Sequence, residues 1–321
     1  MVIREGIRNS SCGGPLATNT AFGWVLSGDI SKPASQRVLC SHVTLEQLVQ
    51  RFWETEEVDR GTLMTDEETQ VERHFMDTHS CLPSGRFMVR LPVQATISQL
   101  GYSRVQAVKR LQSQERRLLQ DVDKYRMYRE FIKEYIDMGH MRLVNSQQPL
   151  PSTQCYYLPH HAVIKESSTT TKLCVVFDAS AKSSTGLSLN DVLKVGPKTQ
   201  QDLFSILIRF RTHPIALVAD VEKMFRQILV HPNDVHLQRI VWRNTPEETI
   251  QDYELLTVTY GTASAPYQST RCLNQLAVDE EASFQAASKV VLRDFYVDDL
   301  VTEATTTQEA ITLSHDICVL L

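Results

Sequence analysis

Two adjacent acidic residues interrupt an otherwise apolar stretch of the chain: Asp298 and Asp299 lie within Phe295–Val301. Successive residues of a strand point to opposite faces, so both carboxylates can reach one site only if they occupy the turn of a hairpin. A third acid, Asp220, ends the apolar stretch Ala216–Ala219, 298 − 220 = 78 residues upstream. Each acid also has an ordinary alternative role, Asp220 as a helix N-cap and the pair as a solvated surface turn.

Carboxylates that meet at the rim of a sheet are suited to binding divalent cations. Like charges held together repel unless a cation neutralises them, and Mg²⁺ prefers oxygen ligands. In nucleotidyl transfer, two metal ions about 3.5–4 Å apart lower the pKa of the attacking 3′-hydroxyl and stabilise the leaving pyrophosphate. We therefore predict that Asp220, Asp298 and Asp299 hold two Mg²⁺ ions, for which Mn²⁺ is a substitute.

The histidines and cysteines indicate no second metal site. His160 and His161 are adjacent in a predicted strand and would face opposite ways, and no cysteine lies at ligand spacing from them or from His140. The seven cysteines form no Cys-x-x-Cys pair, which fits a reducing compartment better than a disulfide framework.

The elements that must position the three acids follow one another in the last third of the chain. Hydrophobic periodicity predicts helices at Gln201–Arg211, Glu222–Gln227 and Ala265–Ala277. It predicts strands at Ile215–Val221, Ile240–Trp242 and Tyr253–Thr259, and a strand-turn-strand unit at Val290–Thr302. The order strand, helix, strand, strand, helix, strand is that of a split β-α-β sheet with helices on one face. The predicted fold class is α+β.

Helices and a second hairpin are predicted upstream. Capping-box spacing at Thr44 with Gln47 and at Thr65 with Glu68 marks two helix starts. Further predicted elements are a strand at Ala21–Leu26, a strand at Phe87–Val93 that Pro92 would place at a sheet edge, one or two helices over Ser103–Met138 ending at Gly139, and a hairpin of Cys155–Lys165 with Lys172–Asp178.

Charge is divided unevenly along the 321 residues. Between Glu46 and Asp77 there are 10 acids and 3 bases, net −7, whereas between Arg86 and Lys133 there are 11 bases and 4 acids, net +7. The basic segment could follow a phosphate backbone, or it could be a solvated helix surface with ordinary ion pairs. No apolar run approaches the roughly 20 residues that span a bilayer, so we expect no membrane contact and a cytoplasmic location.

Several motifs resemble those of one family of polymerases. Tyr296–Asp299 resembles the YxDD box of reverse transcriptases, and Asp220–Phe225 resembles their first palm motif. Four further stretches are similar to the Pao/BEL branch of LTR retrotransposons: Phe52–Glu54, Tyr156–Val163, Val175–Ser180 and Val258–Pro266. The resemblance runs over nearly the whole chain, and the linked motifs are more specific than the YxDD box alone.

This resemblance implies a right-hand polymerase truncated before its thumb. The implied regions are a C-terminal remnant of an aspartic protease at 1–33, a connecting region at 34–100, fingers at 101–213 and palm at 214–321. The sequence has no Asp-Thr/Ser-Gly triplet, so protease activity of this fragment is not expected. The implied activity is RNA-directed DNA synthesis from dNTPs on a primed RNA or DNA template. Thumb, RNase H and integrase segments would complete the polyprotein, and a virus-like particle would house it.

The resemblance also assigns roles to single residues. Asp220 and Asp298 correspond to the main ligands of both metal ions, Asp299 to a supporting ligand and the Val221 carbonyl to a further one. Other residues correspond to the dNTP site: Lys165 and Lys172 for phosphate, Phe225 as steric gate, Gly261 in the loop beneath the base pair, and Tyr296. Phe225 could instead be a core residue, and the lysines ordinary surface residues.

Two positions depart from the family pattern. Cys174 lies four residues before Asp178, where similar enzymes carry an arginine that grips the triphosphate, and a thiol offers no bidentate fork. Tyr260 replaces a glutamine that many reverse transcriptases have. The alternative is therefore a catalytically impaired or domesticated remnant that binds nucleic acid.

Overall fold

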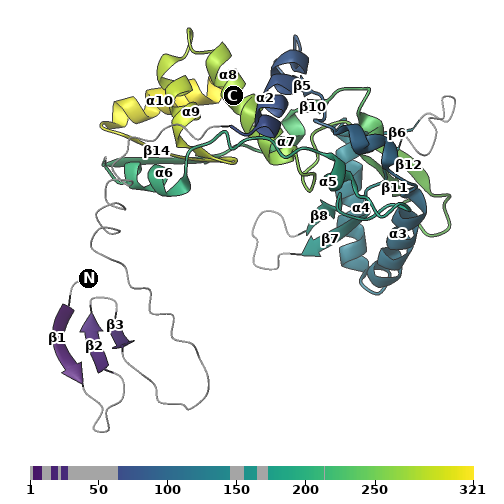
Figure 1. The fold of residues 1–321 in the computed structure, drawn as a ribbon, viewed down its shortest axis with the longest axis horizontal. Helices are drawn as coiled ribbons and strands as arrows, with labels where there is room; N and C mark the ends of the chain where they lie inside the picture. The colour runs from purple at the N-terminus through teal and green to yellow at the C-terminus, as the bar shows by residue number, and fades with distance from the viewer. Residues whose placement is uncertain are drawn as a thin grey trace. The chain divides into compact units, whose positions relative to one another are not determined.

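The computed structural model describes residues 64–144, 155–164, 173–212 and 214–321, together with the backbone of three strands within residues 3–27. Contacts divide the chain into two compact units, Met1–Thr62 and Leu63–Leu321. Figure 1 colours the chain from its N-terminus in purple to its C-terminus in yellow. The division falls inside the predicted connecting region.

The smaller unit contains one antiparallel sheet. Its strands are β1 (Ile3–Arg8), β2 (Leu16–Thr20) and β3 (Gly23–Ser27), with β2 in the middle. The predicted strand Ala21–Leu26 overlaps β3 and is confirmed as a strand. Its assignment to the end of a protease domain remains a prediction.

The larger unit mixes helices and small sheets. Its helices are α2 (Asp66–Thr78), η1 (Ala95–Gln99), α3 (Arg104–Leu118), α4 (Val122–Asp137), α5 (Leu189–Val192), α6 (Leu203–Arg209), α7 (Met224–Gln227), η3 (Val235–Leu237), α8 (Ala265–Asp279), α9 (Gln285–Asp294) and α10 (Thr307–Leu320). None of these helices has the length and apolar composition needed to cross a membrane, in the part of the chain that the structure describes.

The strands that the structure describes in the larger unit form four sheets. The first joins β10 (Leu229–Val230), β5 (Phe87–Val89) and β4 (Ser80–Cys81), and the second joins β11 (Arg239–Trp242), β12 (Gln251–Leu255) and β6 (Met141–Leu143). The third joins β13 (Phe295–Tyr296), β14 (Asp299–Ala304) and β9 (Ile215–Asp220). The fourth is the hairpin of β7 (His160–Ile164) with β8 (Leu173–Phe177). The α+β class is confirmed.

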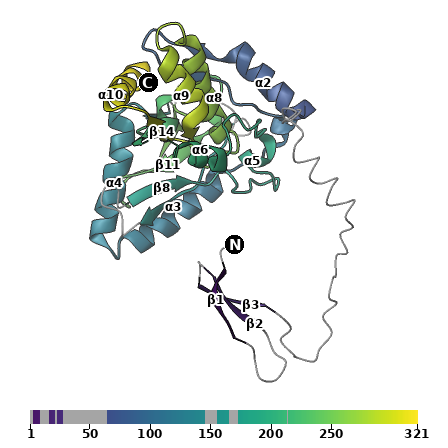
Figure 2. The same ribbon diagram turned by 90° about the vertical axis from the view of Figure 1, so that its left-hand side faces the viewer.

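One hydrophobic core includes buried residues of the helices α3 and α4 and of the strands β8 and β11. Figure 2 shows these two helices beside β8. On α4 the buried residues recur at three or four positions, as one face of a helix requires: Tyr128, Phe131, Ile132 and Tyr135. The Tyr128 ring packs against the fully buried Trp242 of β11, with 5.1 Å between ring centroids. Full burial of each large apolar side chain contributes about 1.5–3 kcal/mol, so this face holds the helix pair on the sheets.

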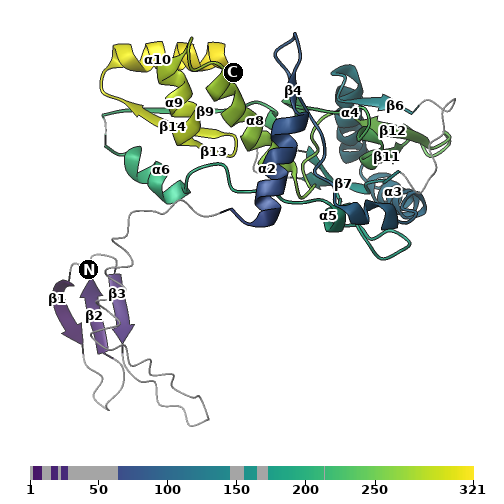
Figure 3. The same ribbon diagram turned by 45° about the horizontal axis from the view of Figure 1, so that its top comes forward.

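A second core lies against the sheet β13-β14-β9. Apolar residues of α8, α9 and α10 pack there against Leu300 of β14 and Phe295 of β13. Figure 3 shows α9 and α10 on one side of β14 and α6 on the other. The helices therefore flank this sheet on both sides, which corrects the prediction that they cover one face only.

Two local predictions at helix ends are confirmed. Thr65 and Glu68 form a reciprocal capping box at the start of α2. Gly139 follows the end of α4 with φ of +68°, a backbone conformation that glycine adopts without strain. The predicted helix start at Thr44 lies outside the described residues.

The predicted split sheet is wrong. β9 pairs with β14, whereas β12 pairs with β11 on one side and with β6 on the other, in a different sheet. The predicted strands at Ile215, Ile240 and Tyr253 follow one another in the predicted order. Order along the chain does not determine which strands are hydrogen-bonded, because pairing also depends on packing against distant helices.

Two further expectations need correction. Residues from Val290 to Asp294 belong to the helix α9, so the strand pair begins only at Phe295. β5 lies between β10 and β4, so it is the central strand of its sheet and not an edge. Pro92 does not prevent this pairing, because the strand ends at Val89, before the proline. The alternating burial of Phe87 and Val89 on one face agrees with the prediction.

Candidate active site

Asp220 is the last residue of β9, and its side chain is exposed at the rim of the sheet. The helix that follows, α7, has Lys223 as its N-cap, with φ of 53° and no capping hydrogen bond from a side chain. Asp220 therefore does not cap this helix. The alternative role of Asp220 as a helix N-cap is therefore excluded.

The pair Asp298 and Asp299 lies at a hairpin, as predicted. Tyr296 of β13 is opposite Asp299 of β14, which leaves Val297 and Asp298 as the two residues of the turn. The backbone of this turn is tied to β9, because the Val221 N–H donates to the Asp298 carbonyl oxygen at 3.0 Å. Both acids are therefore fixed relative to the end of β9.

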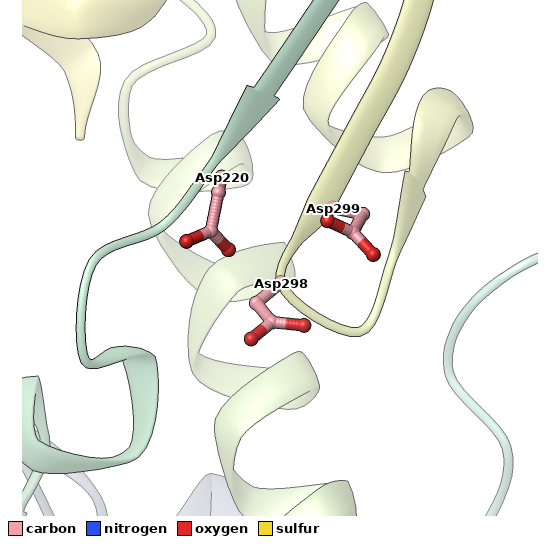
Figure 4. Close-up of side chains that lie close together, drawn as sticks. All are labelled: Asp220, Asp298 and Asp299. Atoms are coloured by element: carbon pink, nitrogen blue, oxygen red, sulfur yellow. The ribbon is translucent and has the colours of Figure 1, made fainter. Parts of the chain in front are cut away.

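The three carboxylates converge. One oxygen from each of Asp220, Asp298 and Asp299 lies within 4.8 Å of the other two (Figure 4). Among the described residues, no other group of three histidine, cysteine, aspartate or glutamate side chains is close enough to hold a metal ion. All the donors are carboxylate oxygens, the ligand type that suits Mg²⁺ and Mn²⁺ and that fits the predicted ions.

Electrostatics at the site favour a cation. Partial burial raises the pKa of Asp220 above its ordinary value, and the neighbouring carboxylates of Asp298, Asp299 and Glu222 raise it further. A divalent cation among these groups would reverse that repulsion, since an opposite charge favours the ionised carboxylate. The donor set and its charge are thus consistent with a metal centre.

The histidines outside this cluster have other surroundings. His160 is buried in β7, where its Nδ1 meets the Tyr128 hydroxyl and its Nε2 lies 3.0 Å from the Val241 carbonyl oxygen. His161, the next residue, is exposed. The two rings face opposite sides of the strand, as expected, and burial lowers the pKa of His160 to about 4.

Phe225 lies in α7, five residues after Asp220, and is only partly buried at the border of the first core. Its ring centroid is 6.4 Å from that of Tyr260, which in turn packs against Phe177 at 5.5 Å. The Tyr260 hydroxyl donates to the Val175 carbonyl oxygen of β8. Tyr260 therefore links the hairpin β7-β8 to the ring proposed as a steric gate.

Gly261 occupies a position that only glycine can fill. Its φ is +97°, and a Cβ atom there would overlap the carbonyl oxygen of Phe177. The loop is held by Asn190, whose Nδ2 donates to the Gly261 carbonyl at 3.0 Å and whose Oδ1 accepts from the Ala263 N–H at 2.8 Å. Sequence analysis did not select Asn190, because a single asparagine carries no motif.

The other predicted nucleotide-binding residues are Tyr296, Lys165 and Lys172, and Cys174 is the position that departs from the family pattern. Tyr296 is 38% exposed and lies one residue before the turn. Lys165 and Lys172 lie outside the described residues. Cys174 is half-buried in β8, opposite Val163 of β7.

A second residue that sequence analysis missed is Gln200. Its side-chain amide bonds both backbone polar groups of Val297, the first residue of the acidic turn. The signal for Gln200 exists only in three dimensions, because 97 residues separate the partners.

Comparison with known proteins finds no family model that matches the sequence and no matching curated protein. The solved structures that are similar to the chain include two crystal structures of prototype foamy virus protease-reverse transcriptase. One is a selenomethionine-labelled CSH mutant, with 15% identity and a TM-score of 0.44; the other is the native protein, with 16% identity and a TM-score of 0.42. Each match covers 59% of this chain and only 21% of that chain.

Proposed function

We propose that this chain is a reverse transcriptase segment of a retroelement polyprotein, of the Pao/BEL type, that adds nucleotides from dNTPs to a primer 3′-hydroxyl. The observation that carries the proposal is the convergence of Asp220, Asp298 and Asp299 from two paired strands. At low sequence identity, the overlap with solved structures carries no functional argument, so the residues of the chain itself must support it.

The site residues have distinct roles in this proposal. Two Mg²⁺ ions bound here would lower the pKa of the 3′-hydroxyl and neutralise charge on the pyrophosphate. Asp220 and Asp298 would hold both ions, Asp299 would support them, and the Val221 carbonyl would be a further ligand. Since the three carboxylates already lie within 4.8 Å of one another in the folded protein, little rearrangement of them is needed when substrate arrives.

The neighbouring residues would select and hold the nucleotide. The Phe225 ring would press on a ribose 2′-hydroxyl and favour deoxynucleotides, and the loop at Gly261 would lie beneath the incoming base pair. Lys165 and Lys172 would contact phosphate as point charges. Tyr296 would contact the nucleotide beside the turn. In this proposal the larger unit supplies the fingers and palm of a right-hand polymerase.

The basic segment would contact the template and primer. Several of its bases are paired with acids, such as Arg110 with Asp178 at 3.2 Å and Arg104 with Asp252 at 2.8 Å. Five others on α3 and α4 are exposed and have no acidic partner among the described residues: Lys109, Arg116, Arg117, Arg129 and Lys133. We call these five residues the unpaired bases. They are available for phosphate.

Primer extension with an oligo(dT) primer on poly(rA), dTTP and Mg²⁺ tests the proposal. Asp298→Asn should lower the rate at least about a hundredfold, because an amide neither carries the charge nor binds both ions. Asp77→Asn is the matched control, since Asp77 is an exposed aspartate at the end of α2. Equal activity of wild type and Asp298→Asn would refute the catalytic role.

The alternative is a remnant that binds nucleic acid without catalysis, and Cys174 favours it because a thiol cannot replace an arginine on the triphosphate. Cys174→Arg separates the two functions. If wild type binds primer-template but extends it slowly, and Cys174→Arg restores extension, the site is an impaired polymerase. If neither protein adds a nucleotide while both bind, the remnant is the correct description.

A further inference from the structure

The acidic turn has an unusual backbone. Val297, its first residue, has φ of +58°, and apart from Lys223 it is the only described non-glycine residue with positive φ. A two-residue hairpin turn of this kind usually has glycine at that position. A β-branched residue there is an outlier, so the surrounding structure must hold it in place.

The side chain of Gln200 forms hydrogen bonds with both the N–H and the carbonyl oxygen of Val297. The Val297 N–H donates to Gln200 Oε1 at 2.7 Å, and Gln200 Nε2 donates to the Val297 carbonyl oxygen at 3.2 Å. A primary amide can both accept and donate in this geometry, whereas a carboxylate can only accept. The identity of residue 200 is therefore matched to the backbone that it meets.

The segment that carries Gln200 is itself anchored. Asn274 of α8 donates from Nδ2 to the Thr199 carbonyl at 3.0 Å, and the hydroxyl groups of Thr199 and Thr270 are 2.6 Å apart. Gly196, in the same segment, lies against the ring of Tyr267 so closely that a Cβ would overlap it. Gln200 thus connects the turn to α8, a long and largely buried helix.

The turn is then held from two sides at consecutive residues. Gln200 holds Val297, and the Val221 N–H holds the carbonyl of Asp298 at 3.0 Å. Val221 follows Asp220 directly, so the second bond fixes the turn to the strand that carries the third carboxylate. Loss of the Gln200 bonds would leave the first half of the turn without a partner.

We propose that Gln200 is a positioning residue: it stabilises the positive-φ conformation of Val297 and thereby holds Asp298 and Asp299 facing Asp220. The metal-binding part of this inference rests on the proposed function. The two hydrogen bonds between Gln200 and Val297 do not depend on that function, and their effect on Val297 can be measured without any metal.

The test compares Gln200→Ala, Gln200→Glu and the double variant Gln200→Ala with Val297→Gly. Isothermal titration with Mn²⁺ should show at least about fivefold weaker binding for Gln200→Ala and for Gln200→Glu, whose carboxylate cannot donate to the Val297 carbonyl. The double variant should regain most of the affinity, because glycine adopts positive φ freely. Gln308→Ala, an exposed glutamine on α10, is the control.

Amide hydrogen exchange supplies the readout that does not depend on metal or activity. We expect the Val297 amide to exchange at least about tenfold faster in Gln200→Ala, with the amides of β9 unchanged. If wild type binds no Mn²⁺, the proposed metal centre is wrong, and hydrogen exchange alone tests whether Gln200 holds Val297. Unchanged exchange at Val297 overturns the proposal. So does a double variant that stays as weak as Gln200→Ala for Mn²⁺ when wild type binds it.

Discussion

Asp220 and Asp299 lie directly opposite each other on the antiparallel strands β9 and β14, at the end of a ladder that begins with Ile215 opposite Ala304. Directly opposed residues of such a pair point to the same face. A register shift of one residue would turn one of the two carboxylates away. The metal centre therefore depends on this register as much as on the three aspartates.

Removing one carboxylate should stabilise the metal-free protein. The pKa of Asp220 is raised in the folded state by burial and by Asp298 and Asp299. Because the folded form binds the proton more tightly than the unfolded form does, stability falls as pH rises through the unfolded pKa towards the folded one, and the loss persists at pH 7.5. In EDTA at pH 7.5, Asp220→Asn should therefore unfold at a higher temperature than wild type in calorimetry.

Mg²⁺ should reverse this order. Wild type gains stability when Mg²⁺ binds the folded state, by about 2.7 kcal/mol at a concentration one hundred times Kd. Asp220→Asn should show little of that gain, whereas the control Asp77→Asn should show all of it. An equal Mg²⁺-dependent rise in Asp220→Asn and wild type would mean that the ion binds elsewhere.

Phe225→Ala tests the steric gate. If the ring excludes the ribose 2′-hydroxyl, the ratio of ribonucleotide to deoxynucleotide incorporation should rise at least about tenfold, which corresponds to roughly 1.4 kcal/mol of discrimination. The measurement is single-nucleotide extension with dTTP and UTP. Phe284→Ala, at the border of the second core, is the control for lost packing. Unchanged discrimination together with lower stability would identify Phe225 as a core residue.

His160 predicts how stability depends on pH. Burial lowers the pKa of His160 from 6.5 to about 4, so below pH 6.5 the unfolded chain takes up a proton that the folded chain refuses. Stability should fall from pH 6.5 to pH 4, with this group contributing roughly 3 kcal/mol across that window. Urea unfolding at several pH values should give a shallower slope for His160→Asn than for His161→Asn. Equal slopes would contradict the buried neutral state.

The unpaired bases of α3 and α4 predict a salt dependence of nucleic-acid binding. Each phosphate contact contributes about 0.9 to the slope of log affinity against log salt for duplex nucleic acid. Arg117→Ala should weaken primer-template binding for every sequence and reduce that slope by about one. Arg73 is an exposed arginine of α2 that is not one of the unpaired bases, so Arg73→Ala should change neither the affinity nor the salt slope in fluorescence anisotropy. A slope that Arg117→Ala does not change would place the nucleic acid on another surface.

The sequence was informative where local chemistry dictates local structure. Asp298 and Asp299 within an apolar stretch required a turn, and the structure has one. The periodic residues of α3 and α4 gave both helices, since one face of each must be buried. Gly139 and the capping box at Thr65 marked helix ends for the same local reasons.

Pairing between distant segments could not be obtained in the same way. From its sequence, the short apolar run at Val290 fits a strand or a buried helix equally well. In the structure it is part of α9, whose apolar residues pack against those of α8 and α10. The choice of β14 as partner of β9 depends likewise on tertiary contacts. Asn190 and Gln200 have no sequence signal, because their importance lies in backbone groups more than 70 residues away.

The most direct test of the metal centre is an anomalous difference map from a crystal of this chain soaked in Mn²⁺. We predict a peak with carboxylate oxygens of Asp220 and Asp298 at roughly 2.1 Å, close to the distance typical of Mg²⁺ ligands. That peak should be absent in Asp298→Asn. A well-ordered wild-type site with no peak at these three carboxylates, at an Mn²⁺ concentration that supports primer extension, would contradict the proposed polymerase centre.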